Sequence, residues 1–221
     1  MKIRWYGQSA FLLTGKTHSV FTDPFYDTSH MAARGIRFAY PAIQGVHADL
    51  VLITHEHGDH NGQAAIVSPE TVIRSTAGTF DTPVGKVVGV NSDHDQAAGT
   101  QRGANKIYTF ELDGLRLCHF GDFGQDALRP EQRAAIGPVD VLMLPVGAGP
   151  TIGPEKAREV AAELSPRWII PMHYRTELLG MLEVPDAFFA MYNRAHRIGG
   201  TEIDLDKAPD ADLLIFDTPS A

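Results

Sequence analysis

One segment of this chain limits both its fold and its chemistry. Residues 49–54 (DLVLIT) form a short, continuous apolar run, which is typical of a strand buried on both faces of a sheet. This run leads directly into the polar sequence THEHGDHNG, residues 54–62. Open α/β sheets place their binding sites at the carboxyl ends of such strands. We therefore expect a layered α/β fold with a functional site where this strand ends.

Four side chains in this polar segment are of the kinds that bind zinc and similar divalent ions: His55, His57, Asp59 and His60. His55 and His57 are two residues apart, so an extended chain places both on one side. Gly58 then lets the chain turn, and the next two ligands can face the same cavity from another direction. The alternative is a polar turn that is rich in histidine by chance, which is unfavourable because buried His and Asp need partners.

The remaining patterns predict one mixed α/β domain over residues 1–221. Further strands are expected at 2–6, 10–14, 18–22, 71–75, 85–90, 105–112, 115–120, 140–146, 167–171 and 212–216. Helices are expected at 62–68, 130–136, 154–164 and 185–196. The 140–146 run (DVLMLPV) repeats the Asp-plus-apolar pattern of 49–54, which suggests two similar halves. Residues 24–47 read as an irregular loop, and a loop this long is usually functional or mobile.

The composition argues against several classes of function. Lys and Arg number 19 against 27 Asp and Glu, giving a formal charge of −8, which argues against a non-specific nucleic-acid binder. Cys118 is the single cysteine, so a disulfide within the chain and a thiolate-rich zinc site are both excluded. It lies in an apolar run, and we interpret it as a core residue rather than a nucleophile. No signal peptide or membrane-spanning run is recognisable, so we expect a cytoplasmic protein with no membrane partner.

The polar segment resembles the metallo-β-lactamase superfamily, whose signature is HxHxDH at the end of a strand. The resemblance covers almost the whole chain, and Asp23 in FTDPF resembles the acidic residue that usually supports the histidine loop. Three more ligand positions follow in the superfamily's order: His94 in NSDHDQ, Asp122 in HFGDFG and His173 in IPMHY. The resemblance implies a four-layer αββα sandwich, with two sheets back to back and helices outside.

The resemblance also implies how the metal would be held. One ion would be bound by His55, His57 and His94, and the second by Asp59, His60 and His173, with Asp122 bridging both. Two divalent ions can share a bridging hydroxide and clamp a substrate oxygen, so a Ser or Cys nucleophile is not required. We expect zinc, with manganese or iron as alternatives, and predict that Asp59 and Asp122 are the catalytic carboxylates.

A closer resemblance is to stand-alone bacterial hydrolases of this superfamily, the group that includes L-ascorbate-6-phosphate lactonase. It rests on KIRWYGQSAFLL, RGANKIYTFELDGLRLCHFGDFG and PVGAGPTIGPEKA. That group often has Gly-His where this chain has Gly7-Gln8. The resemblance implies a hydrolase acting on a small-molecule lactone, ester, amide or phosphoester. Because 221 residues fit the sandwich with little to spare, we expect the loop 24–47 to set the specificity.

Several roles stay open. Four residues next to the expected ligands could contact substrate or be structural: Arg102, Asn105, Tyr174 and Arg175. An arginine there could hold a phosphate or carboxylate. His30 could line the pocket, and His119 could support the ligands or only pack. The loop aromatics could form a pocket wall or anchor the loop: Phe25, Tyr26, Phe38 and Tyr40.

Three other functions compete with the hydrolase. Histidine and carboxylate ligands also suit Fe(II), so an iron-dependent oxidoreductase resembling sulfur dioxygenases is the main alternative. A nuclease is disfavoured by the charge of −8, and a non-catalytic metal-binding module by the complete ligand set. Small molecules are thus the expected partners, without nucleic acid, and a homo-oligomer stays open.

Overall fold

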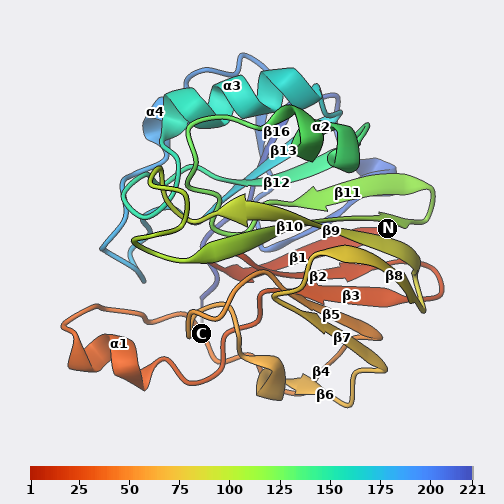
Figure 1. Ribbon diagram of the computed structural model, residues 1–221, viewed down its shortest axis with the longest axis horizontal. Coiled ribbons are helices and arrows are strands. Elements are labelled where there is room, and N and C mark those ends of the chain that lie inside the picture. The colour runs from red at the N-terminus through yellow and green to blue at the C-terminus, as the bar shows by residue number, and fades with distance from the viewer. Residues whose placement is uncertain (221) are drawn as a thin grey trace.

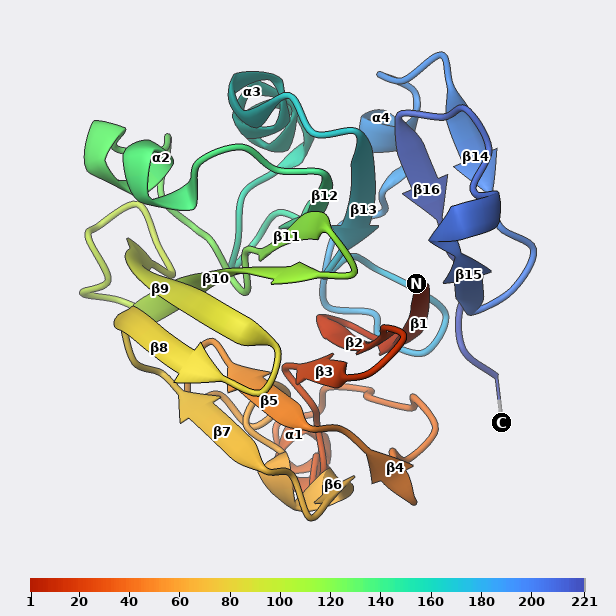
Figure 2. The ribbon, with the colours of Figure 1, turned by 90° about the vertical axis from the view of Figure 1, so that its right-hand side faces the viewer.

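The computed structural model describes residues 1–220, and its main feature is a pair of β-sheets packed face to face (Figure 1 and Figure 2). The first sheet has the strand order β15 (Glu202–Asp204), β1 (Lys2–Gly7), β2 (Ala10–Thr14), β3 (Ser19–Thr22), β5 (Leu50–Ile53) and β7 (Thr71–Arg74). The second has the order β14 (Ala195–Arg197), β16 (Leu213–Ile215), β13 (Trp168–Met172), β12 (Val141–Pro145), β11 (Leu115–His119), β10 (Ala104–Leu112), β9 (Gly85–Asp93) and β8 (Gly78–Thr82). A separate pair is formed by β4 (Val46–His47) and β6 (Ile66–Val67).

The two strands with the Asp-plus-apolar pattern occupy equivalent places in the two sheets. β5 is parallel to its neighbours β3 and β7, and β12 is parallel to β11 and β13. Every residue of β5 and β12 is buried, as expected for parallel strands covered on both faces. The repeated pattern therefore marks, in each sheet, a buried strand that has a parallel neighbour on both sides.

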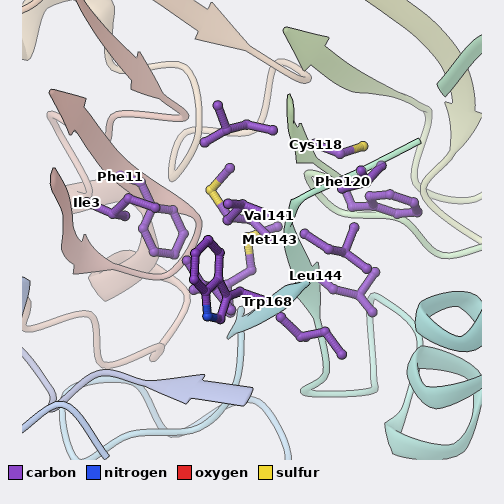
Figure 3. Packing of buried hydrophobic residues seen from close by; sticks show 14 of the residues in the cluster. Ile3, Phe11, Cys118, Phe120, Val141, Met143, Leu144 and Trp168 are labelled. Carbon is purple, nitrogen blue, oxygen red and sulfur yellow. The ribbon is translucent and has the colours of Figure 1, made fainter. Parts of the chain in front are cut away.

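The core between the sheets follows from the alternation of side chains along each strand. In β1, Ile3 and Trp5 are buried while Lys2 and Arg4 are exposed, the period of two that a half-buried strand requires. Figure 3 shows Ile3 beside Phe11 on the first sheet, facing side chains of the second. Each such side chain contributes about 1.5–3 kcal/mol when it is fully removed from water.

Cys118 in β11 belongs to this apolar interior and is fully buried (Figure 3). Burial raises the pKa of its thiol well above the ordinary value, so the thiolate is strongly disfavoured. This confirms the interpretation of Cys118 as a core residue.

Helices cover the outer face of the second sheet (Figure 1): α2 (Pro130–Ile136), α3 (Pro154–Leu164) and α4 (Asp186–Phe189). In α3 the buried stripe is Ala157, Val160, Ala161 and Leu164, the face that its spacing predicts. The helix expected at 185–196 is wrong after Phe189, because residues 195–197 instead pair with β16 as an edge strand. Tertiary pairing here outweighs local propensity. No helix in residues 1–220 is long and apolar enough to cross a membrane.

The outer face of the first sheet has a different cover. The long loop 24–47, with the five-residue α1 (Ser29–Ala33), lies there together with β4 and β6. Phe25 and Tyr40 pack against Phe21 and Val51 of the sheet, so these two loop aromatics are anchors. Tyr26, by contrast, is 62% exposed. The fourth layer is therefore mostly irregular chain rather than helix.

The helix expected at 62–68 is also wrong. Only Gln63–Ala65 form a single 3₁₀ turn, and Ile66–Val67 pair with β4. A side chain at Gly62 would lie 2.4 Å from the carbonyl carbon of Phe25, so the two segments touch through their backbones. This contact with the long loop and the pairing with β4 are both tertiary, so the local pattern does not reveal them.

Candidate metal centre

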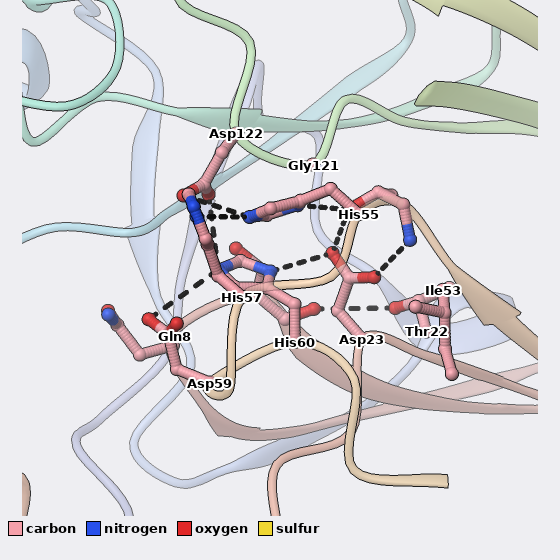
Figure 4. Close-up of polar contacts among 12 residues, drawn as sticks. Gln8, Thr22, Asp23, Ile53, His55, His57, Asp59, His60, Gly121 and Asp122 are labelled. Atoms are coloured by element: carbon pink, nitrogen blue, oxygen red, sulfur yellow. Dashed lines mark hydrogen bonds and ion pairs between the residues drawn. The ribbon is translucent and has the colours of Figure 1, made fainter. Parts of the chain in front are cut away.

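The ends of four strands meet at one edge of the sandwich and bring together all seven predicted ligands. Figure 4 shows His55, His57, Asp59, His60 and Asp122 there, with Asp23 behind them. The loop after β5 supplies four of them: His55, His57, Asp59 and His60. The other three follow β9, β11 and β13, and are His94, Asp122 and His173. β13 is connected to β11 through parallel pairs, and β9 runs in the same direction as β11 because both are antiparallel to β10. These strands therefore end at the same edge, which is where α/β sheets place their sites.

The ligands fall into two groups. In the first, the ligand atoms of His55, His57, His94 and Asp122 all lie within 4.8 Å of one another. In the second, those of Asp59, His60 and His173 do so.

The Asp122 carboxylate lies between these groups. Its Oδ2 is 3.1 Å from His94 Nε2 and 3.3 Å from His173 Nε2, and its Oδ1 is 3.3 Å from His60 Nε2. Asp122 therefore contacts histidines of both groups, His94 of the first and His60 and His173 of the second.

The donor atoms fit divalent ions. His60 Nε2 and Asp122 Oδ1 are buried and make no hydrogen bond within residues 1–220, although they lie 3.3 Å apart. Buried polar atoms without partners are costly, and here they face a common point among nitrogen and oxygen ligands. A cluster of imidazoles and carboxylates without thiolates is the ligand chemistry of zinc, manganese and iron.

Hydrogen bonds fix which ring nitrogen is free in three of the histidines. His60 Nδ1 lies 2.9 Å from Asp23 Oδ2, and His94 Nδ1 lies 3.0 Å from the Pro150 carbonyl. Both partners are acceptors, so each Nδ1 carries the proton and leaves Nε2 free. Thr54 Oγ1 donates to Asp23 and therefore accepts from His55 Nδ1 at 3.0 Å. The Nε2 atoms of these three rings are thus acceptors, the form that binds metal, and that of His55 lies 3.0 Å from His57 Nδ1.

The charges of the site are balanced around Asp122. Burial would raise the pKa of Asp122, but His173, His60 and His94 hold it well below the ordinary value. Burial lowers the pKa of His55, His57 and His173, so these rings are neutral at pH 7 and ready to act as ligands. The pKa values of His60 and His94 are raised instead, because Asp122 outweighs burial at both rings, with help from Asp59 at His60.

Asp23 is the support that the resemblance implied. It is fully buried and accepts hydrogen bonds from the Thr54 amide and hydroxyl, both at 2.8 Å, as well as from His60. Its backbone has a φ of 44°, which is unfavourable for a residue with a Cβ. His173 (φ 52°) and Gln8 (φ 50°), which also lie at the site, share this conformation.

Asn105, whose role the sequence left open, holds Asp122. Its Oδ1 accepts from the Asp122 amide at 3.0 Å, and its Nδ2 donates to Ser92 Oγ and the Phe120 carbonyl, both at 2.8 Å. Gly121, between Phe120 and Asp122, has a φ of 53°, and a Cβ there would come within 2.4 Å of Asn105 Oδ1. The Gly-Asp turn therefore needs a glycine both for its backbone and for this close approach.

His119 and Gln8 lie behind the ligands. His119 is fully buried, with Nε2 2.9 Å from the Ser9 carbonyl and Nδ1 accepting from the Gly121 amide at 3.1 Å. It thus both packs in the core and supports the turn that carries Asp122. Gln8 is buried, and its backbone carbonyl accepts from the Trp5 indole at 2.9 Å, while its side-chain Oε1 has no partner within residues 1–220.

A cavity of about 470 Å³ opens over the ligands, lined in part by the long loop and by the segment after His94. His30 is in this lining, as one reading of the sequence allowed, and so are Arg34 and Arg102. Tyr174 and Arg175 are placed elsewhere: Tyr174 packs on Trp5, and Arg175 donates to the Leu182 carbonyl. No motif in the sequence pointed to Arg34, because only the folding of α1 brings it to the cavity.

Comparison with known proteins agrees with this geometry. The family described as a beta-lactamase superfamily domain matches residues 2–173. A metal-dependent hydrolase of Thermococcus onnurineus is 32% identical over 203 residues, covering 80% of this chain and 85% of that protein. One from Thermus thermophilus is 33% identical over 201 residues, covering 80% and 84%.

Among solved structures, a proposed zinc-dependent hydrolase of the metallo-β-lactamase superfamily from Thermotoga maritima is similar, with a TM-score of 0.77. The two are 33% identical, and the match covers 97% of each chain. From its ligand loop, its sandwich of sheets and these relatives, the chain belongs to a family of metal-dependent hydrolases within the β-lactamase superfamily.

Proposed function

We propose that this protein hydrolyses a small molecule with two divalent ions, zinc in the first place, bound at the seven-residue cluster. The observation that carries the proposal is the division of the ligands into two groups with the Asp122 carboxylate between them. When bound, two such ions would lower the pKa of a coordinated water towards about 7 and polarise the substrate's oxygen.

The chain's own residues prepare this chemistry. Asp23, Thr54 and the Pro150 carbonyl hold three imidazoles with the proton on Nδ1, which leaves the Nε2 lone pair of each ring for an ion. The Asp122 carboxylate stays ionised among the imidazoles and offers its charge to both sides. Asp59, the less enclosed carboxylate, lines the cavity and can receive a proton from the attacking water or pass it to the leaving group.

The size of the cavity favours a small substrate. A volume of about 470 Å³ is within the range of small-molecule sites and is bounded by the long loop, α1 and the segment after His94. We propose lactones, esters, amides and phosphoesters as the bonds to test, since each places an oxygen where two ions can polarise it.

The test begins with metal analysis of the purified protein and a screen of generic ester, lactone, amide and phosphodiester substrates. Activity should vanish in chelator, return with Zn²⁺ or Mn²⁺, and fall by at least about a hundredfold in His57→Ala and Asp59→Ala. His196→Ala is the matched control, because His196 is exposed in β14. Turnover that persists in chelator would refute the proposal, and iron with oxygen uptake would replace it with the oxidoreductase.

A further inference from the structure

We propose that the substrate carries an anionic group, a carboxylate or a phosphate, which Arg34 and Arg102 bind at the rim of the cavity. This deepens the proposed function, since it uses the same cavity, but it rests on different residues from the metal ligands. Both arginines line the cavity, and both are exposed rather than buried in the protein.

Arg102 is held in place by an ordered turn next to a ligand. The carboxylate of Asp95, the residue after His94, accepts four backbone hydrogen bonds at 2.7–3.1 Å, from Ala97, Gly99, Gln101 and Arg102. These bonds close residues 95–102 into a compact turn. The backbone of Arg102 is therefore fixed with respect to the imidazole of His94.

Arg34 comes from a different part of the chain, the end of α1. Its amide donates to the Met31 carbonyl at 3.0 Å, and the Met31 side chain is buried. His30, the residue before Met31, packs closely on the ligand loop. A Cβ at Gly58 of that loop would lie 2.3 Å from the His30 imidazole ring. α1 is thus seated on the loop that carries Asp59, with Arg34 at its end.

Both guanidinium groups are free of protein partners. Apart from Arg34, Arg37 and Arg102, every arginine in residues 1–220 contacts a carboxylate, a backbone carbonyl or an aromatic ring. Glu56, the acidic residue of the cavity wall outside the ligand set, is already bound by Arg74 through both of its oxygens. In a chain with a formal charge of −8, the cavity therefore keeps two uncompensated positive groups.

Arginine suits this role chemically. Its planar guanidinium donates two parallel hydrogen bonds to a carboxylate or phosphate, and it stays charged at every pH of interest. Two such groups beside a metal centre attract the anionic end of a substrate and orient the molecule. The bond to be cleaved, at the neutral end, is then placed over the metal-binding residues.

The test compares a neutral and an acidic ester of similar size, 4-nitrophenyl butyrate and mono-4-nitrophenyl succinate. In Arg34→Ala, Arg102→Ala and the double variant, KM for the acidic ester should rise about tenfold or more per arginine, while kcat/KM for the neutral ester stays within twofold. Arg37→Ala is the control, because Arg37 also lacks a protein partner but is not in the lining of this cavity. Equal losses on both esters, or the same loss in Arg37→Ala, would overturn the inference.

A binding experiment separates this inference from the proposed function. Succinate and inorganic phosphate are titrated calorimetrically into the metal-free and the metal-loaded protein. The one that binds more tightly shows whether the substrate's anionic group is a carboxylate or a phosphate. We expect the double variant to bind at least tenfold more weakly in both forms of the protein. If binding depends on the arginines but no ester is cleaved, only the proposed hydrolysis fails; if binding is unchanged in the double variant, the arginine site is refuted.

Discussion

Asp23→Asn should disturb both halves of the metal centre at once, although Asp23 itself is not a ligand. The Thr54 amide can only donate, so the new side chain must keep its oxygen at the position of Asp23 Oδ1. Its NH₂ group then faces Thr54 Oγ1 and His60 Nδ1, where the native carboxylate oxygen accepts two hydrogen bonds.

The consequence is a change of tautomer in two rings. His60 Nδ1 must become an acceptor, which moves the proton to Nε2 and blocks its lone pair. Thr54 Oγ1, now receiving a hydrogen bond, turns its own hydrogen towards His55 Nδ1 and forces the same change there. One histidine of each ligand group is thus held in the form that cannot bind a metal.

The magnitude follows from the bond that is lost. The His60–Asp23 contact is 2.9 Å long and fully buried, and hydrogen bonds to charged groups contribute roughly 1.5–3 kcal/mol. This corresponds to a weakening of metal binding by roughly 10–150-fold for the second group, with a smaller loss for the first.

The assay is a competition titration of Zn²⁺ against a chromophoric chelator, with the ring tautomers read by nitrogen-15 NMR. Asp49→Asn is the matched control, because Asp49 caps Ser19 through two similar hydrogen bonds at the start of β5, away from the ligands. Unchanged zinc affinity in Asp23→Asn, with the fold intact, would refute the reasoning.

Three further predictions concern the support of the site and the core. Asn105→Ala removes three buried hydrogen bonds and should lower the free energy of unfolding by about 2–4 kcal/mol, measured by urea denaturation of the metal-free protein. Gly121→Ala should cost about 2–5 kcal/mol in the same assay, because of its φ of 53° and the clash with Asn105; a loss under 1 kcal/mol would show that the turn can relax. Cys118 should react with a thiol reagent at the rate of global unfolding, and rapid labelling of the folded protein would contradict its burial.

Sequence reasoning succeeded where the signal is local. The buried runs of β5, β12 and β13 are continuous and apolar, so their position could be predicted to within one or two residues. α2 and α3 begin with a proline in the first turn and match their expected ranges.

It failed where neighbours decide the structure. The short strands β8, β14 and β15 are largely exposed edge or near-edge strands with no apolar alternation, and only their partners give them hydrogen bonds. The positive φ of Asp23 and His173 likewise has no sequence signature, since neither is a glycine. The cover on the first sheet could not be predicted either, because Phe25 and Tyr40 anchor a loop without periodicity.

The candidate site also has a part that local sequence predicts and a part that it does not. The HxHxDH segment places four candidate ligands within six residues, whereas His94, Asp122 and His173 could be chosen only through the family resemblance. Their convergence depends on four strands ending at one edge. The hydrogen bonds from Asn105 to the Asp122 turn and the position of Arg34 at the cavity both depend on tertiary structure. The sequence left the role of Asn105 open and did not indicate Arg34.

The most direct test of a two-ion centre is the anomalous scattering of zinc-loaded crystals, measured on both sides of the zinc absorption edge. Our account predicts two peaks, one among His55, His57 and His94 and the other among Asp59, His60 and His173, each within bonding distance of Asp122. A single peak, or peaks away from these seven residues, would contradict it.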